Sequence, residues 1–532
     1  MLAPPALRIP PEIQNIICHD VALERMDLVN LALLCKRWHA VADAAAWENV
    51  DGMQSLLRLM PSNVWEEFEG EHTASSLHFT CELTKDDWAP VLAKSRYVRS
   101  LYMAYLHPDV QRDIASYPPS QTLFPALREL CIEESSERGS IDMDPDFADV
   151  LIPPTLSILR VSSYWRDMCD QVAFVVKCCK ESVTEVYVKN WLYITQERDR
   201  KPDSERVTLL ELLEALKMCP RISHVSLELR LDPDPELLQA LSQCPALKVL
   251  ELSFGDDVPQ QEWVPGRLLK NAASRFPAMY DLRVYGGSFL DVLRIIEPDQ
   301  QASHRKLKSI YVHAGHFDES QKLQSLTKYM KDWCDASTLG QVTIRRANII
   351  REDRQEWPLL FDHINPLTML SGLRDVLIGG LYGTRITDND CATMARAWHD
   401  LESLSIGVTA DYETGTGCTL QALSPFVCHC PHLQLLCLPL DAINIPEVPQ
   451  PTTPFQQNES KSRILFRLDI SYGAISDPHA VADFLRELFL HERVWLRYRR
   501  NVMSQGLVME EESRRANLWT TVRKLAFPVP KR

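Results

Sequence analysis

The chain has 532 residues, of which 45% are hydrophobic and 24% charged, and its 57 Lys and Arg against 72 Asp and Glu give a net charge of −15. This length exceeds that of one compact domain unless repeated units extend the core. An acidic chain repels phosphate backbones, which argues against general nucleic-acid binding. The charge is uneven, because residues 491–532 hold 10 basic and 4 acidic side chains and are therefore locally positive.

The N-terminal sequence MLAPPALRIPPEI has no basic segment followed by an apolar one, so we expect no signal peptide. No run of about 18 uncharged apolar residues predicts a membrane span. The 15 cysteines are odd in number and lack the spacing of a disulfide framework, which suits a reducing compartment. We expect a cytoplasmic or nuclear protein that does not associate with membranes.

Residues 7–50 predict three short helices. Pro10 and Pro11 can open the first, since a first-turn proline lacks only an N–H that would be unpaired anyway. A second is expected from Asp27, and a third over the segment AVADAAAW at 40–47. About 45 residues cannot bury this much apolar surface alone, so it must pack on the rest of the chain or on another protein. The apolar positions at helical spacing are Ile13, Ile16 and Ile17 in the first helix and Leu28, Leu31, Cys35 and Trp38 in the second.

A repeat with the pattern x-L-x-x-L-x-L fills most of the remaining chain. Its first and last copies begin at Val98 and Leu465, 367 residues apart in twelve intervals, which is about 31 residues each. The L-x-L part alternates as a strand does, and the intervening residues often carry helical periodicity. Stacked strand–helix units bury one another's apolar edges and form a curved solenoid with parallel strands inside and helices outside. The first apolar positions of the copies are Val98, Leu127, Leu156, Val183, Ile222, Leu247, Met279, Leu307, Leu339, Leu373, Leu401, Leu433 and Leu465.

Four regions follow from these patterns. They are a helical motif at 1–50, a connecting segment at 51–95, the solenoid at 96–475 and a C-terminal helical cap at 476–532, where DPHAVADFLRELFLHERVWLRYRRNV at 477–502 predicts one amphipathic helix. Long loops are expected at 196–206, 255–266 and 446–460.

Strand alternation also predicts which side chains point out of the strand layer on the inner face. Tyrosine and arginine often anchor protein interfaces, and both recur there. For any single one of these residues an ordinary mixed polar strand face with no binding role is the simpler explanation, and the cluster across 281–313 is the preferred candidate site. The predicted substrate-binding residues are Tyr187, Asp281, Arg283, Tyr285, Tyr311, His313 and Arg345.

Two resemblances carry the functional expectation. The I-P-P-E-I opening at 9–13, the D-L-x-N-L-A-L-x-C-K-R-W centre at 27–38 and the closing W-x-x-V at 47–50 resemble the F-box. The repeat resembles the leucine-rich-repeat family. Together they imply a substrate receptor that docks on a Skp-type adaptor, and through it on a cullin-RING ubiquitin ligase, while the repeats capture an unknown protein substrate. By resemblance, the adaptor-contacting or motif-core residues are Ile9, Pro10, Pro11, Ile13, Leu31, Leu34, Cys35 and Trp38.

The alternative is a leucine-rich-repeat scaffold whose F-box-like end caps the first repeat or serves a role outside ubiquitination. The two hypotheses differ in whether residues 51–95 cover the motif's apolar surfaces or leave them exposed.

Catalytic chemistry has no comparable signal. No phosphate-binding glycine loop, nucleophile elbow or H-E-x-x-H zinc motif occurs, so we expect a non-catalytic protein without a cofactor. Cysteines and histidines gather between Cys418 and Cys437, but their spacing matches no standard zinc site. Cys430-Pro431 also occupies the same repeat position as Cys219-Pro220 and Cys244-Pro245, which favours a small buried side chain over a metal ligand.

Overall fold

The structure is a computed structural model that divides into two compact units, which are described separately. The first unit comprises residues 1–229, 235–248 and 276–278, and the second comprises residues 230–234, 249–275 and 279–532. The described residues are 9–20, 22–68, 76–103, 106–133, 143–163, 168–190, 202–228, 235–253, 276–286, 304–314, 320–346, 358–409, 416–447, 466–471, 473–489, 494–499 and 507–527.

Three helices open the first unit, α1 (Pro11–Cys18), α2 (Arg25–Ala32) and α3 (Lys36–Ala46). The expected continuous helix over 27–38 is wrong, because Cys35 adopts an extended backbone (φ −168°, ψ 167°) and separates α2 from α3. Asp27 is also not the N-cap. The helix begins after Glu24, whose backbone N–H donates to the Asp27 carboxylate at 3.0 Å in a capping box.

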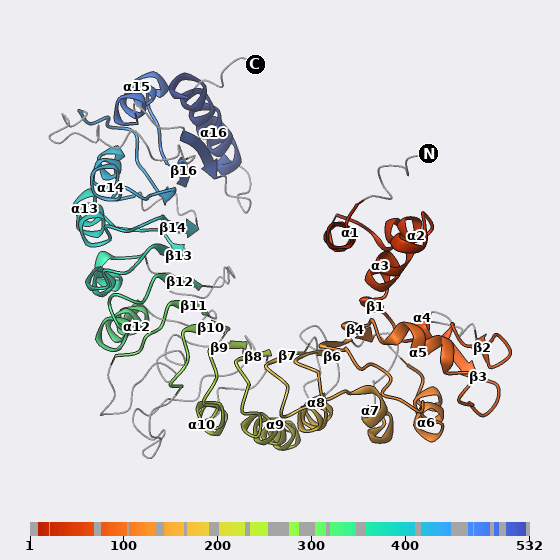
Figure 1. Cartoon of the computed structure of the whole chain (residues 1–532). Coiled ribbons are helices and arrows are strands. Elements are labelled where there is room, and N and C mark those ends of the chain that lie inside the picture. Colours follow the sequence, from red (N-terminus) through yellow and green to blue (C-terminus); the bar gives the residue numbers. More distant parts are fainter. Residues whose placement is uncertain are drawn as a thin grey trace, which may run out of the picture. The chain divides into compact units, whose positions relative to one another are not determined.

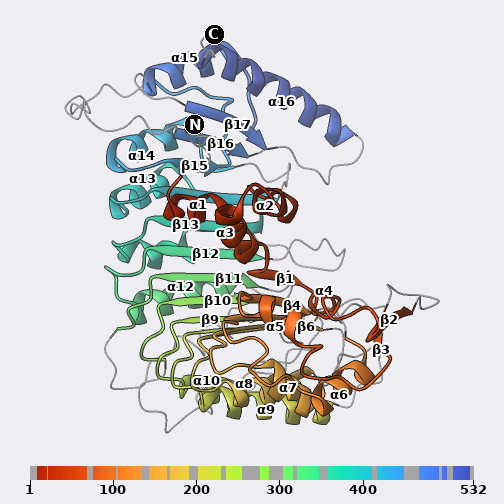
Figure 2. The same cartoon turned by 45° about the vertical axis from the view of Figure 1, so that its right-hand side comes forward.

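Parallel strands form the sheet of the first unit, with helices along one face (Figure 1). An antiparallel hairpin of β2 (Trp65–Phe68) and β3 (Ser76–Phe79) precedes the second of these strands (Figure 2). The parallel strands are β1 (Asn49–Asp51), β4 (Ser100–Met103), β5 (Glu129–Glu133), β6 (Ile158–Ser163), β7 (Glu185–Asn190) and β8 (His224–Glu228). The helices are α4 (Gln54–Leu57), α5 (Ala89–Ser95), α6 (Pro108–Ser116), α7 (Pro145–Leu151), α8 (Met168–Cys178), α9 (Pro202–Lys217) and α10 (Pro235–Ser242).

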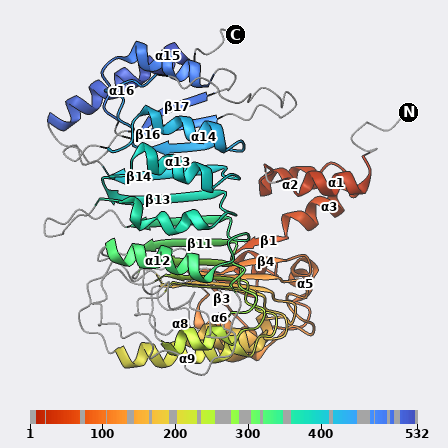
Figure 3. The same cartoon turned by 90° about the vertical axis from the view of Figure 1, so that its left-hand side faces the viewer.

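The second unit repeats this arrangement, and Figure 3 shows α12, α13 and α14 in front of its strands. Its parallel strands are β9 (Val249–Ser253), β10 (Asp281–Tyr285), β11 (Ser309–Ala314), β12 (Gln341–Arg346), β13 (Asp375–Tyr382), β14 (Ser403–Thr409), β15 (Leu435–Leu438), β16 (Phe466–Ser471) and β17 (Val494–Arg499). The helices are α12 (Ser320–Trp333), η3 (Phe361–His363), η4 (Asn365–Met369), α13 (Asp388–Ala397), η5 (Leu420–Ala422), α14 (Leu423–His429), α15 (Pro478–Leu488) and α16 (Leu507–Ala526).

The repeat register confirms the predicted solenoid. Each strand from β4 to β15 begins two residues after the apolar position that starts its repeat, as Ser100 follows Val98 and Ser403 follows Leu401. These starting positions are fully buried from Val98 to Leu401, except that Met279 is 5% exposed, while Leu433 is half-buried and Leu465 lies outside the described residues. Side chains three and five positions after each starting residue are buried on the helix side, whereas those two and four positions after it lie on the other face, which we call the open face.

The sheet extends beyond the expected limits of 96–475 at both ends. β1 pairs with β4 across the segment predicted to be a connection, and β17 pairs with β16 inside the predicted cap. Residues 494–499 therefore form a strand, and the predicted helix over 477–502 is wrong there, because V-W-L-R-Y-R alternates with period two. Residues 202–206 of the first expected loop begin α9, and the loop at 255–266 lies outside the described residues, as does 448–460 of the third. No helix in the described parts is long and apolar enough to cross a membrane.

Candidate functional sites

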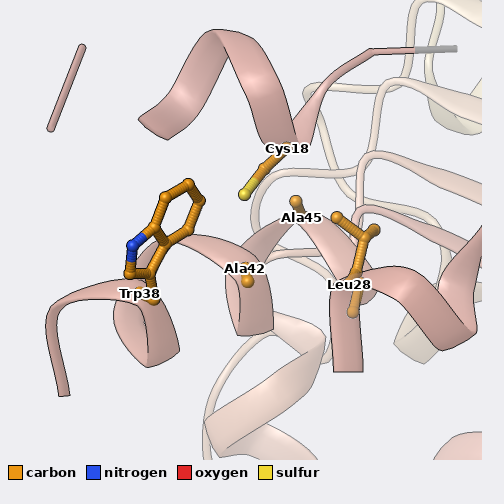
Figure 4. Close-up of a cluster of buried hydrophobic side chains, with 6 residues drawn as sticks. Cys18, Leu28, Trp38, Ala42 and Ala45 are labelled. Carbon is orange, nitrogen blue, oxygen red and sulfur yellow. The ribbon is translucent and has the colours of Figure 1, made fainter. Parts of the chain in front are cut away.

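The N-terminal motif has a small core made by its own three helices. Trp38 is 3% exposed and packs with Cys18 and Leu28 on small residues of α3 (Figure 4). The alanine run of α3 brings the helices close, because a methyl side chain keeps little space between backbones. Partly buried Ile9, Ile17, Leu31, Cys35 and other apolar residues complete this cluster.

The same three helices leave a large apolar surface exposed. Six of the twelve exposed large apolar side chains in the described residues lie between positions 13 and 34. Two stripes are evident, one on α1 and one along α2 into the turn that follows. We call these six residues the N-terminal apolar face: Ile13 (45% exposed), Ile16 (66%), Met26 (68%), Val29 (42%), Leu33 (77%) and Leu34 (58%).

Polar contacts fix the motif to the first repeat on the side of α3. Lys94 of α5 lies 2.7 Å from both carboxylate oxygens of Asp43, and both side chains are largely buried. Glu48 lies 2.6 Å from His19 Nε2 and 3.0 Å from an Arg99 guanidinium nitrogen. The described part of 51–95 therefore meets α3 and leaves the N-terminal apolar face uncovered.

The predicted adaptor residues divide between this face and the core. Pro10, Pro11, Ile13 and Leu34 are exposed. Ile9, Leu31 and Cys35 are half-buried against the motif core, and Trp38 is a core residue that presents almost no surface. Sequence reasoning missed Met26, Val29 and Leu33, although their spacing of three and four residues is that of one helix stripe.

The predicted substrate-binding residues lie on strands, with their buried neighbours alternating as expected. Tyr187 belongs to β7 in the first unit, and the other six belong to β10, β11 and β12 in the second. Asp281 is nearly buried, whereas Arg345 is exposed. In the second unit the register places Arg283 beside Tyr311 and Tyr285 beside His313, so these four share adjacent rows of the open face.

Asp281 and Arg283, which lie in the same strand of the second unit, are already hydrogen-bonded. Asp281 accepts from an Arg283 guanidinium nitrogen at 2.9 Å and from the Ser309 hydroxyl at 2.5 Å. The Tyr285 and Tyr311 rings lie 5.0 Å apart between centroids. Partial burial, with a smaller contribution from nearby negative charge, raises the pKa of Tyr285 to about 12, so its hydroxyl stays protonated at neutral pH. The cluster presents two tyrosine rings and the partly exposed Arg283 guanidinium on the open face.

Tyr187 lies at the centre of a comparable network in the first unit. The Arg160 guanidinium stacks 3.9 Å from the Tyr187 ring centroid and donates to Glu129 at 2.7 Å. The Tyr187 hydroxyl donates to Glu185 at 2.8 Å and lies 3.1 Å from His224 Nδ1. Partial burial and the Glu185 hydrogen bond raise the pKa of Tyr187 to about 12. This network holds the Tyr187 side chain in one orientation on the open face.

The cysteines of the Cys-Pro positions pack inside the repeats. Cys430 is buried beside the Trp398 carbonyl at 3.4 Å, and Cys219 and Cys244 likewise lie near carbonyl oxygens of preceding helices. Burial raises the pKa of Cys430 to about 12, which disfavours the thiolate that a metal would need. Among the described residues, no three His, Cys, Asp or Glu side chains are grouped so as to hold a metal ion.

Comparisons with known proteins add little beyond the architecture. No protein-family profile matches the sequence, and no curated protein matches it significantly. A similar solved chain comes from the crystal structure of the yeast Rad7 and Elc1 complex, at a TM-score of 0.38 and 12% identity, covering 81% of this chain and 88% of that one. A likeness this distant carries no implication for partners or activity.

Proposed function

We propose that the chain is a non-catalytic substrate receptor of a Skp-cullin-F-box ubiquitin ligase. The N-terminal motif docks on a Skp-type adaptor, and the open face of the repeats captures a protein substrate. Ubiquitin transfer is the work of other subunits, so the receptor needs neither a cofactor nor a metal. Such a complex would operate in the cytoplasm or the nucleus.

The observation that carries this proposal is the exposed N-terminal apolar face. A monomer gains nothing from six exposed large apolar side chains within 22 residues, and apolar patches of this kind mark protein interaction sites. The alternative, a cap that shields the first repeat, predicts that these side chains are buried against residues 51–95. Their exposure, together with the attachment of the motif through Asp43 and Glu48 instead, favours docking over capping.

The test is complex formation between the full-length protein and a purified Skp-type adaptor, followed by size-exclusion chromatography with light scattering. We expect a 1:1 complex for the unaltered protein. Leu33→Glu with Leu34→Glu should abolish it, because both side chains are more than half exposed and charge placed in an apolar interface is not compensated. The folded state should tolerate both changes for the same reason.

The matched control is Met369→Glu with Ile443→Glu, which adds the same two charges at exposed apolar side chains (63% and 50%) of the second unit. This variant should bind the adaptor as the unaltered protein does. Circular dichroism and thermal melting of each variant check that the fold is intact. No complex with the unaltered, folded protein at tens of micromolar would reject the receptor hypothesis and leave the repeat scaffold.

A further inference from the structure

A second exposed surface lies in the second unit, on the open face of β15, β16 and β17. Trp495 is 56% exposed there, although tryptophan is the largest apolar side chain and its strand neighbour Leu496 is 2% exposed. The register places Trp495 beside Arg467, and Arg467 beside half-buried Leu435. Arg497 is exposed one row further along β17. We call Leu435, Arg467, Trp495 and Arg497 the C-terminal patch.

Arg467 is held in a fixed orientation within this patch. Its Nε and one terminal guanidinium nitrogen donate to the two carboxylate oxygens of Asp469 at 2.9 and 2.8 Å. The Asp469 side chain is fully buried, whereas 41% of the Arg467 side chain is exposed. A guanidinium has five N–H donors, so this pairing leaves donors directed away from the pair. Arg467 is thereby preorganised to bind a further acceptor without ordering its side chain first.

The charge of the C-terminal patch is positive on a protein that is otherwise acidic. Among the described open-face side chains of β15 to β17, two arginines face one carboxylate, Asp469, which Arg467 already neutralises. Asp469 also lies beside Arg497 in the register, but its single negative charge offsets only one of the two arginines, so these side chains carry one net positive charge next to Trp495. By sequence, the net charge is +6 for residues 491–532, −2 for residues 1–50 and −19 for the 440 residues between them. This contrast favours a negatively charged partner at this end of the open face.

We infer that the C-terminal patch binds an acidic, extended segment of a protein partner, with an apolar side chain packing on Trp495 and Asp or Glu side chains meeting Arg467 and Arg497. Tryptophan and arginine are the residue types most often found at the energetic centre of interfaces. The two arginine Cα atoms lie roughly 8 Å apart, since adjacent strands are about 4.8 Å apart and alternate residues about 6.7 Å. Alternate residues of an extended peptide match that separation. The inference rests on the proposed function only in regarding this partner as the substrate.

The test uses the full-length protein without an adaptor and measures fluorescence anisotropy of fluorescein-labelled peptides. The probe is a peptide of four Asp-Leu-Glu repeats, compared with four Lys-Leu-Arg repeats and four Ser-Leu-Gln repeats. We expect binding of the acidic peptide alone, weakening as salt rises because the attraction is partly electrostatic. Trp495→Ala and Arg497→Glu should each weaken it at least about tenfold. Arg497 is exposed but lies beside Asp469 in the register, so circular dichroism must show that Arg497→Glu is folded; the variant then tests the patch even where Trp495→Ala perturbs the fold.

The matched control is Arg345→Glu, the same charge reversal at another exposed arginine of the open face, on β12. It should change binding less than about twofold, because it lies several strands away and salt screens it. Equal binding of all three peptides, or loss of binding with Arg345→Glu but not with Arg497→Glu, would overturn the inference. A peptide of four Ser-Leu-Glu repeats with phosphorylated serines that binds more than about tenfold tighter than the acidic peptide would overturn the choice of carboxylates. Adaptor binding by Arg497→Glu should be unchanged, which separates this surface from the N-terminal apolar face.

Discussion

Replacing either of two buried glutamines of the first unit with methionine should change local stability, in opposite directions for the two positions. Gln14 of α1 is 0% exposed, and neither its amide nitrogen nor its carbonyl oxygen has a hydrogen-bond partner. A buried polar group without a partner costs about 1–3 kcal/mol, because it has given up its hydrogen bonds to water. Methionine has a similar length, adapts to irregular space and has no strong hydrogen-bonding group. Gln14→Met should therefore stabilise the motif by about 1–3 kcal/mol.

Gln111 of α6 is the matched control, since it is 1% exposed but fully engaged. Its amide nitrogen donates to the Leu106 carbonyl at 2.9 Å, and its side-chain oxygen accepts from the Asp144 N–H at 3.1 Å. Gln111→Met removes both bonds and leaves two backbone groups without their partner. We expect a loss of about 2–4 kcal/mol, so the effects of the two substitutions should differ by roughly 5 kcal/mol.

Hydrogen exchange followed by mass spectrometry is the suitable assay, because a repeat protein opens locally and a single unfolding free energy is not well defined. Exchange in α1 should slow for Gln14→Met, and exchange in α6 should quicken for Gln111→Met. Adaptor binding should stay unchanged for Gln14→Met, since the side chain presents no surface. Faster exchange in α1 of Gln14→Met would show that the amide is satisfied in solution and would refute the reasoning.

Three further predictions concern the repeats. Burial lowers the pKa of His363, so below the ordinary histidine pKa of about 6.5 the unfolded segment binds a proton that the native state resists. Hydrogen-exchange protection in η3 and α12, corrected for the intrinsic pH dependence of exchange, should therefore fall as the pH is lowered from 7.5 to 5.5, and should fall less in His363→Gln. Exposed Cys428 should react with iodoacetamide at pH 8, while Cys334, whose pKa burial raises to about 12, should stay unmodified by peptide mass mapping. Gly473→Ala should speed hydrogen exchange in α16, because the added methyl group would collide with the Leu440 carbonyl. The Gly473 carbonyl, which accepts a hydrogen bond from Trp519 Nε1 of α16, would then be displaced.

The repeat core could be predicted from the sequence because one rule is applied many times. The apolar residue that starts a repeat, such as Leu307, must be buried, and the same requirement returns in the next repeat about 31 residues later. Errors in single units therefore do not accumulate. The N-terminal motif occurs once, so a wrong prediction for one of its helices is not corrected by other copies. Its three isoleucines at 13, 16 and 17 satisfy one helical stripe on paper, yet only Ile17 packs inward while Gln14 and Cys18 fill the buried positions.

Sequence periodicity shows which residues share a face, but the tertiary structure determines what that face contacts. A helical stripe indicates that apolar residues share a face, but not whether that face packs on the chain itself or stays exposed, and Ile13 and Leu33 are exposed. The half-buried contacts of Tyr187 with Arg160 likewise depend on neighbouring strands that are 27 residues apart in sequence. Single-sequence reasoning has no access to that neighbour.

The misassigned strand at 494–499 shows how secondary structure controls the functional hypothesis. On a helix, residues two apart point in directions about 200° from one another, so Trp495 and Arg497 would lie on opposite sides. On a strand they share a face, and pairing with β16 adds Arg467 to that face. The helical periodicity of α15 ends at Leu488, and the alternation V-W-L-R-Y-R that follows was the available signal. The C-terminal patch exists only because the solenoid continues by one strand beyond the last copy of its leucine pattern, and that strand carries charge opposite to the acidic body.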